Sequence, residues 1–486
     1  MDARLRVDWL CPGAITALAL LLRLWNLGGQ SIWYDEAFSL LLARYDFAEI
    51  AVRTARDVHP PLYYWLLHLW GEGLWIDAHP RLLSTLAGTV SVPLVFAIGR
   101  RLFDSPTAAA AALLTAVAPF QVFYGQEVRM YALLGLWNLI AGYGLIAAWQ
   151  SGTKWGWPLF TTGIVLALYT HPLGWAPPIA LLTGIVLTAP GRRALLRPAL
   201  VSVAAVGFAF LPWAAVLAAQ SGAVLGSFWA APPTAVNAAA SPYLFFMGPF
   251  AGAGLFPPAI AAVLLTLALS LPAALRRHPD ATALRMLWCW IGLPLLGLLA
   301  LSLVRPVYLE RVVFGSSFAA YLLMGWSVAR LPVRALGLVV AALLSMAAMV
   351  GLHNWYGDPA FAKPPQREAA AAAVARWQPG EPVLHTGHGS YLAFLLYAPQ
   401  MPNRLLAGDP EENQPTTRAN ATRQTLDVIS VPAPEAVGAA RRFLVVVALD
   451  GSIEFQRSLV SALDARYQRV DGQQIGGIQI LEYEIR

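Results

Sequence analysis

The sequence of 486 residues predicts an α-helical polytopic membrane protein with a smaller α/β domain at its C-terminal end. Hydrophobic residues make up 58% of the chain and charged residues only 12%, whereas soluble globular domains are about 25% charged. Apolar stretches of about 17–22 residues recur up to residue 353, and each is long enough to cross a hydrocarbon core roughly 30 Å thick. We therefore predict a transmembrane domain over residues 1–353 and an extracytoplasmic domain over residues 354–486.

Eleven segments are predicted to span the membrane. They cover residues 9–28, 80–99, 107–123, 131–149, 155–170, 173–189, 199–218, 253–274, 285–304, 311–330 and 335–353. Basic pairs such as Arg100-Arg101 and Arg276-Arg277 fall on one side if all eleven segments span. Because basic loops stay in the cytoplasm, this pattern places the N-terminus inside and the C-terminal domain outside. The net charge of +6 therefore reflects topology and does not indicate a nucleic-acid partner.

Lysine is rare in this chain. Only Lys154 and Lys363 are lysines among the 33 basic residues, which indicates a GC-rich, bacterial genome. We therefore expect an integral protein of a bacterial inner membrane, with its active site and C-terminal domain facing the periplasm or the exterior.

The first outer loop, residues 29–79, is predicted to contain helices of its own. Residues 36–55 are predicted to form one partly amphipathic helix, and an aromatic helix is expected after Pro60-Pro61, since proline favours the first turn of a helix. Tyrosine and tryptophan favour the membrane interface, so we expect these helices to lie along the outer leaflet. The alternative is that they only cover the helix bundle.

The unusual polar residues all fall on the outer side under this topology. Ionisable groups near bilayer depth are costly and are therefore candidates for function. They lie in the first loop (Asp35, Glu36, Asp57, His59), in the turn 124–131 (Glu127, Arg129, Tyr131), at His171, and in the segment 305–311 (Tyr308, Arg311). The pair Asp35-Glu36 suits acid–base or metal-assisted chemistry. The alternative is a helix-capping role, because an acidic pair complements a helix dipole.

Four motifs occur in a fixed order along the chain. They are Trp33-Tyr-Asp-Glu-Ala37, Asp57-Val-His-Pro-Pro-Leu-Tyr-Tyr64, Gln126-Glu-Val-Arg-Met-Tyr131 and Tyr308-Leu-Glu-Arg311. Together they resemble the type C glycosyltransferases that use polyprenyl-phosphate sugars, among them protein O-mannosyltransferases and the aminoarabinose transferases that modify lipid A. The resemblance covers residues 9–353. It implies the type C glycosyltransferase fold and a sugar donor whose phosphate lies at the outer membrane surface.

The resemblance also implies roles for four residues. Asp35 is the expected catalytic base, with Glu36 supporting the acceptor side, and a base opposite the leaving group gives inversion at the sugar carbon. Arg129 and Arg311 are the expected ligands of the donor phosphate, because guanidinium groups match phosphate oxygens bidentately. The alternatives are structural: an ion pair with Glu127 or snorkelling for Arg129, and an internal pair with the neighbouring Glu310 for Arg311.

His59 stands where the aminoarabinose transferases typically carry a lysine. We predict it as a further phosphate ligand, but with Asp57 and His171 it could instead bind a divalent metal. A metal cofactor therefore remains possible. The predicted substrate-binding residues are Asp57, Tyr63, Glu127, Tyr131, His171 and Tyr308.

The C-terminal domain contains alternating helical and strand patterns. Residues 366–377 are predicted to be helical, residues 382–386 and 443–449 to be strands, and residues 408–434 to be an irregular loop. An α/β domain favours a lipid or cell-envelope glycan as the acceptor, since the extra domains of protein O-mannosyltransferases are β-rich. The alternatives are a protein O-mannosyltransferase, or a transporter or flippase of polyprenyl-linked sugars, for which repeat symmetry would be expected.

Overall fold

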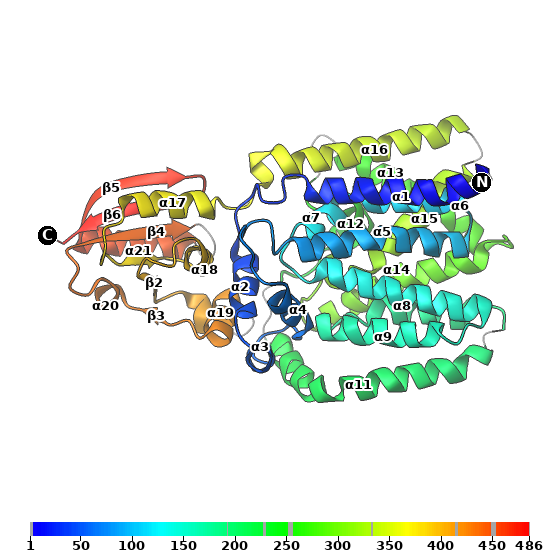
Figure 1. The fold of residues 1–486 in the computed structure, drawn as a ribbon, viewed down its shortest axis with the longest axis horizontal. Coiled ribbons are helices and arrows are strands. Elements are labelled where there is room, and N and C mark those ends of the chain that lie inside the picture. Colours follow the sequence, from blue (N-terminus) through cyan, green and yellow to red (C-terminus); the bar gives the residue numbers. More distant parts are fainter. Residues whose placement is uncertain are drawn as a thin grey trace.

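Long helices run side by side through one half of the molecule, and a small α/β unit lies beyond one end of them (Figure 1). The structure is a computed structural model, and it describes residues 3–191, 193–226, 230–250, 256–331, 334–413, 417–448 and 453–485. The N-terminus lies at the end of the helix bundle that is remote from the α/β unit (Figure 1).

Each predicted span overlaps a helix of the bundle. The helices are α1 (Ala3–Leu24), α5 (Leu82–Leu102), α6 (Ser105–Val117), α7 (Pro119–Gly125), α8 (Tyr131–Ser151), α9 (Gly156–Thr170), α10 (Ala176–Thr188), α11 (Arg193–Gly226), α12 (Ala235–Met247), α13 (Phe256–Leu275), α14 (Ala281–Val304), α15 (Ser316–Arg330) and α16 (Arg334–Gly357). Within the described residues, six helices are long and apolar enough to cross a membrane, and the bent pair α6–α7 makes a seventh. The count of eleven spans stays a prediction, and α12 was not predicted.

A buried arginine occupies the bend between α6 and α7. The two helices meet at 55°, where Pro119 interrupts the backbone hydrogen bonds. Arg23 of α1 donates to the carbonyl oxygens of Thr115 (3.2 Å) and Ala116 (3.1 Å) in the last turn of α6. A Cβ atom on Gly125 would lie 3.0 Å from the Nε of Arg23, so glycine leaves room for the guanidinium. The arginine therefore satisfies carbonyl groups that the bend leaves free.

Three short helices lie between the bundle and the α/β unit: α2 (Tyr34–Ala43), α3 (Phe47–Thr54) and α4 (Leu62–Trp70) (Figure 1). The single helix predicted for residues 36–55 is wrong, because Asp46 caps a new helix by accepting a hydrogen bond from the backbone N–H of Glu49 (2.8 Å). The aromatic helix after Pro60-Pro61 is present as α4.

The α/β unit contains one six-stranded sheet. Its elements are α17 (Gln366–Arg376), β1 (Val383–His385), α18 (His388–Tyr397), β2 (Asn403–Leu406), α19 (Arg418–Leu426), β3 (Ser430–Val431), α20 (Ala433–Val437), β4 (Arg442–Ala448), α21 (Ile453–Arg466), β5 (Gln468–Ile475) and β6 (Ile478–Glu484). The strand order is β3-β2-β1-β4-β6-β5, with β1 to β4 parallel and the last two pairings antiparallel. The apolar run 443–447 is buried in β4, at the centre of the sheet, as its composition predicts.

Helix α19 joins the α/β unit to α2 and α3. The hydroxyls of Tyr34 and Thr422 are 2.8 Å apart, and Arg53 pairs with Asp427 at 2.8 Å. The prediction of an irregular loop over residues 408–434 is therefore wrong, although residues 414–416 lie outside the described part. The side chain of Thr417 caps α19. The sequence of α19 is polar and has no clear apolar face, so it gives little helical signal. In the structure this helix packs against α2 and α3.

Candidate active site

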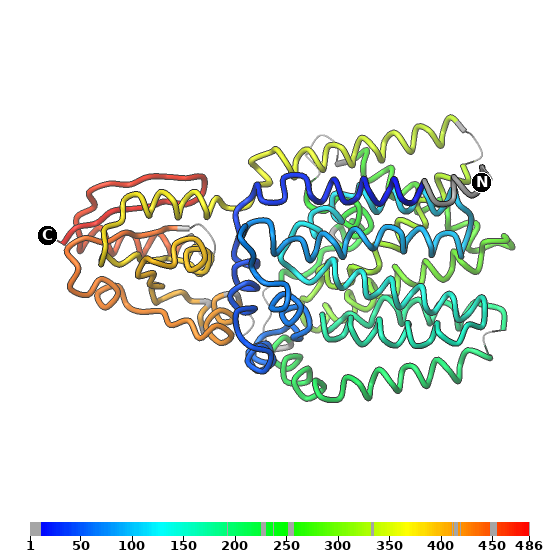
Figure 2. Tube along the Cα trace, viewed as in Figure 1, coloured from blue at the N-terminus to red at the C-terminus, as the bar shows by residue number. Residues whose placement is uncertain are grey.

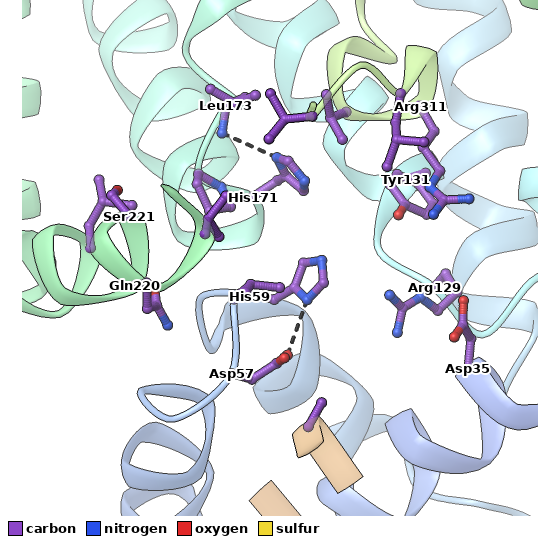
Figure 3. Close-up of a pocket in the computed structure, with 18 of the residues that line it drawn as sticks. Asp35, Asp57, His59, Arg129, Tyr131, His171, Leu173, Gln220, Ser221 and Arg311 are labelled. Atoms are coloured by element: carbon purple, nitrogen blue, oxygen red, sulfur yellow. Dashed lines mark hydrogen bonds and ion pairs between the residues drawn. The ribbon is translucent and has the colours of Figure 1, made fainter. Parts of the chain in front are cut away.

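A cavity of about 300 Å³ is lined by residues from the end of the helix bundle and from the α/β unit. Its walls come from α2, the segment before α4, the turn 126–130 with the start of α8, the segment 171–173 after α9, α11 and α14, the segment 307–309 with η1 (Glu310–Val313), and the start of α19. The polar lining residues are Tyr34 and Thr417, together with Asp35, Asp57, His59, Arg129, Tyr131, His171, Gln220, Ser221 and Arg311, which are labelled in Figure 3. The remaining lining residues are mostly aliphatic.

Seven of the eleven predicted site residues line this cavity. They are Asp35, Asp57, His59, Arg129, Tyr131, His171 and Arg311. These residues come from segments that are separate in the sequence, among them α2, the start of α8 and η1, and their side chains gather around one cavity (Figure 3). The four motifs that lie far apart in the sequence therefore contribute side chains to one cavity.

Asp35 and two arginines form the charged side of the cavity. Asp35 lies in the first turn of α2, beside Arg129 (Figure 3). Burial would lower the pKa of Arg129, but Asp35, Tyr64, Tyr131 and Asp57 together outweigh burial and raise that pKa well above its usual value. The pKa of Arg311 is also raised, chiefly by Tyr131, whose ring centroid is 5.8 Å from the guanidinium carbon. Both guanidinium groups therefore stay charged.

Arg129 has hydrogen-bonding capacity to spare. Its Nη1 donates to the hydroxyl of Ser39 at 3.4 Å, but its buried Nε has no hydrogen-bond partner in the described part of the chain. Buried donors without a partner are rare in folded proteins. An anion in the cavity would supply an acceptor beside this guanidinium.

His59 and His171 lie on the other wall, and their Nδ1 atoms have opposite hydrogen-bonding roles. The Nδ1 of His59 lies 3.1 Å from the Oδ2 of Asp57, and because a carboxylate only accepts, Nδ1 is the donor. In His171 the Nδ1 instead accepts from the backbone N–H of Leu173 (3.1 Å), so its neutral ring carries the proton on Nε2. The two rings are 5.7 Å apart. A neutral His59 therefore presents an acceptor and His171 presents a donor.

The possible metal site gains no support from this geometry. Within the described residues, no group of three His, Cys, Asp or Glu side chains could hold a metal ion. The Nδ1 atoms of His59 and His171 already have partners, Asp57 and a backbone amide. The three side chains form a hydrogen-bonding surface instead.

We expect His171 to make stability depend on pH. Burial, together with His59, Arg129 and Arg311, lowers the pKa of His171 well below its usual value, so the ring stays neutral in the native state. The unfolded chain takes up a proton as pH falls through about 6.5, so the free energy of unfolding should decrease below that pH. Thermal unfolding at pH 5 and pH 7 measures this difference, which should shrink in His171→Gln. An equal difference in the variant would contradict it.

Four predicted site residues lie outside the cavity. Glu36 is fully buried, and its carboxylate accepts from Arg81 (2.8 and 2.7 Å) and from the backbone N–H of Val128 (3.0 Å). Glu127 is buried in an ion pair with Lys363 at 2.6 Å. Both carboxylates therefore pair with cations inside the protein, and neither glutamate lines the cavity.

The two tyrosines are also positioned away from the cavity. Tyr63 is buried in α4, with its ring centroid 5.6 Å from that of Tyr64. The hydroxyl of Tyr308 lies 2.7 Å from that of Ser241 in α12. We therefore assign these side chains to packing and not to the cavity surface.

The chain matches one protein-family model in part and several solved structures over almost its whole length. Residues 58–218 match the family model described as dolichyl-phosphate-mannose-protein mannosyltransferase. Two structures of ArnT from Cupriavidus metallidurans match this chain, and each match covers 98% of this chain and 98% of ArnT. The apo structure matches with a TM-score of 0.66 at 14% identity. The structure bound to undecaprenyl phosphate matches with a TM-score of 0.64 at 13% identity. The chain has a type C glycosyltransferase fold. Its predicted fold class and the resemblance drawn from the four motifs are thereby confirmed.

A third solved structure also has a similar fold. The oligosaccharyltransferase AglB from Archaeoglobus fulgidus, in complex with an inhibitory peptide and a dolichol-phosphate, matches 97% of this chain and 73% of its own at 11% identity, with a TM-score of 0.54. A search of the curated proteins returns no match.

Several cavity residues of this type C fold were not predicted. Gln220 and Ser221 lie on α11, which continues to Gly226 beyond the predicted end at residue 218. Two polar residues after a long apolar run were the available signal. Thr417 comes from the α/β unit and carries no signal of its own.

Proposed function

We propose that the protein transfers a sugar from a polyprenyl-phosphate donor to a hydroxyl group of a lipid or cell-envelope glycan on the outer face of the membrane. The observation that carries this proposal is the convergence of Asp35 with Arg129 and Arg311 in one cavity. A carboxylate supplies a base, and the guanidinium groups of buried Arg129 and half-buried Arg311 supply a site for a phosphate.

The donor phosphate is assigned to the two arginines. Arg129 has a buried Nε without a partner among the described residues, and Arg311 lies on the same side of the cavity (Figure 3). Aliphatic side chains of α11 and α14, such as Leu217, Val224 and Leu301, supply an apolar wall for a prenyl chain. The bound lipids named for ArnT and AglB, undecaprenyl phosphate and dolichol-phosphate, have this combination of a phosphate and a long apolar chain.

The reaction follows from the positions of these groups. Asp35 accepts the proton of the acceptor hydroxyl as its oxygen attacks the anomeric carbon of the sugar. The bond from that carbon to the phosphate oxygen breaks, and polyprenyl phosphate leaves with the electron pair. Arg129 and Arg311 stabilise the charge on the leaving phosphate, and attack from the opposite face inverts the anomeric carbon.

The histidine pair is assigned to the sugar hydroxyls. Hydroxyl groups both donate and accept, and His171 and His59 present a donor and an acceptor on one wall. A cavity of about 300 Å³ is at the small end of the range for ligand pockets, which suits one sugar with its phosphate.

The acceptor is assigned from the α/β unit. Thr417 and Ala421 of this unit line the cavity, so an acceptor would approach between α19 and the outer helices. The fold match to ArnT covers the α/β unit as well as the bundle. These features favour a lipid or an envelope glycan over a protein as the acceptor.

A turnover assay tests the proposed function. Protein in nanodiscs would be given polyprenyl phosphates carrying different hexoses and pentoses, together with an envelope lipid extract. We expect at least one donor to release free polyprenyl phosphate only when an acceptor is present. If donors bind and none is consumed, the transfer reaction is excluded and a carrier or flippase function replaces it.

A further inference from the structure

Lys363 is a buried lysine in the linker between the helix bundle and the α/β unit. The linker runs from α16 to α17 and contains η2 (Pro359–Phe361). The Nζ of Lys363 lies 2.9 Å from the Oε2 of Glu36 and 2.6 Å from the Oε1 of Glu127, and its side chain is only 6% exposed. The lysine therefore bridges two buried carboxylates that come from separate parts of the sequence.

Both glutamates are close in sequence to the proposed machinery. Glu36 follows Asp35, and Glu127 precedes Arg129 by two residues. The carboxylate of Glu36 also accepts a hydrogen bond from the backbone N–H of Val128 (3.0 Å), which ties the first turn of α2 to the turn 126–130. The positions of Asp35 and Arg129 therefore depend on how the buried side chains of Glu36 and Glu127 are held.

The charges of the Glu36 and Glu127 carboxylates are balanced by two cations, Arg81 and Lys363. Burial and the charge of Glu36 raise the pKa of Glu127, whereas Lys363 and Arg81 oppose that rise. Burial would also raise the pKa of Glu36, but Arg81 and Lys363 outweigh burial and lower it. Removing one member of a buried ion network leaves an uncompensated charge, which is strongly unfavourable.

The linker is held at this place by bonds to the segment before α2. The backbone N–H of Lys363 donates to the Oε1 of Gln30 (2.8 Å), and the hydroxyl of Ser31 donates to Glu368 of α17 (2.8 Å). Arg367 pairs with Asp77 at 2.9 Å. The linker runs beside this segment in Figure 2. Docking of the α/β unit therefore sets the position of Lys363.

We propose that Lys363 is a positioning residue for the transfer reaction: its ammonium group, inserted between Glu36 and Glu127, holds the first turn of α2 against the turn 126–130 and thereby sets Asp35 relative to Arg129. This inference rests on the proposed function. It makes the active site of the helix bundle depend on the linker to the α/β unit.

Lys363→Met tests the inference through the separation of kcat from KM. We expect kcat to fall about 10- to 100-fold, because a misplaced base reacts slowly, while KM for the donor changes little because both arginines remain. Glu127→Gln/Lys363→Met removes one carboxylate together with the cation and should recover most of the lost kcat. Lys154→Met, at the chain's other lysine, which is exposed in a loop, should behave as wild type.

An unchanged kcat in Lys363→Met, or a double variant no faster than the single one, would overturn the inference. If Lys363→Met is not recovered as folded protein, Lys363→Arg replaces it. This variant keeps the charge, but its larger guanidinium should displace α2 and lower kcat, and a wild-type kcat there would also overturn the inference.

Amide hydrogen exchange separates this inference from the proposed function. Residues 34–43 and 126–130 should exchange faster in Lys363→Met than in wild type and return towards wild type in the double variant. If wild-type protein consumes no donor, the proposed function fails, but the exchange experiment still tests the coupling. Unchanged exchange in both segments would mean that Lys363 does not hold them together.

Discussion

Asp35→Asn is expected to lower the transfer rate by a factor of about 10²–10⁴, the usual contribution of a general base, while the donor still binds. Asparagine has nearly the same shape as aspartate but cannot accept the acceptor's proton. It also removes a negative charge beside Arg129, so the donor phosphate should bind at least as tightly as in wild type. Single-turnover kinetics with a saturating donor, together with a donor-binding titration, measure the two effects separately.

Two variants serve as controls for Asp35→Asn. Asp471→Asn changes an aspartate that is largely exposed in the α/β unit and should leave the rate unchanged. Glu36→Gln changes the adjacent carboxylate, which faces Arg81 and not the cavity, so it should lower thermal stability as well as activity. A wild-type rate in Asp35→Asn would remove Asp35 as the base, and a loss of donor binding with an unchanged rate constant would assign it to binding.

The contrast between Asp35 and Glu36 shows where sequence reasoning reaches its limit. Both acidic residues were predicted to be catalytic, and the helix-capping alternative also held that they lie in the first turn of α2, where they are found. Neighbouring residues on a helix point about 100° apart, so only one of the pair faces the cavity. The motif identifies the helical turn, but the orientation of that turn comes from tertiary packing.

Residues that reach the site region from the linker and the α/β unit could not be predicted from the sequence, also because tertiary packing places them. Thr417 lines the cavity and Lys363 pairs with the two buried glutamates outside it, both from segments far along the chain, and neither belongs to a recognisable motif. By contrast, Arg129, His171 and Arg311 were predicted because each follows or precedes an apolar span on the outer side. Topology thus brings together residues at the ends of spans, whereas docking of the α/β unit cannot be inferred from periodicity.

Arg81→Met is expected to lower the free energy of unfolding by about 3–5 kcal/mol, the usual cost of breaking a buried ion pair. Arg81 is 1% exposed and donates two hydrogen bonds to Glu36. It also donates to the carbonyl oxygens of Leu27 (2.8 Å), Gln30 (2.9 Å) and Ser31 (3.2 Å). Methionine fills similar space but leaves a buried carboxylate and three carbonyl groups without this donor.

The matched control is Arg44→Met, because the ion pair of Arg44 with Glu72 is 45% exposed at the arginine. Exposed pairs contribute about 0–1 kcal/mol, so the control should unfold near the wild-type temperature. Thermal unfolding in one detergent at one pH compares the three proteins. Because Arg81 fixes both the segment before α2 and Glu36, Arg81→Met should also lose transfer activity below its unfolding temperature. Equal midpoints for Arg81→Met and Arg44→Met would show that the buried pair does not hold the outer helices on the bundle.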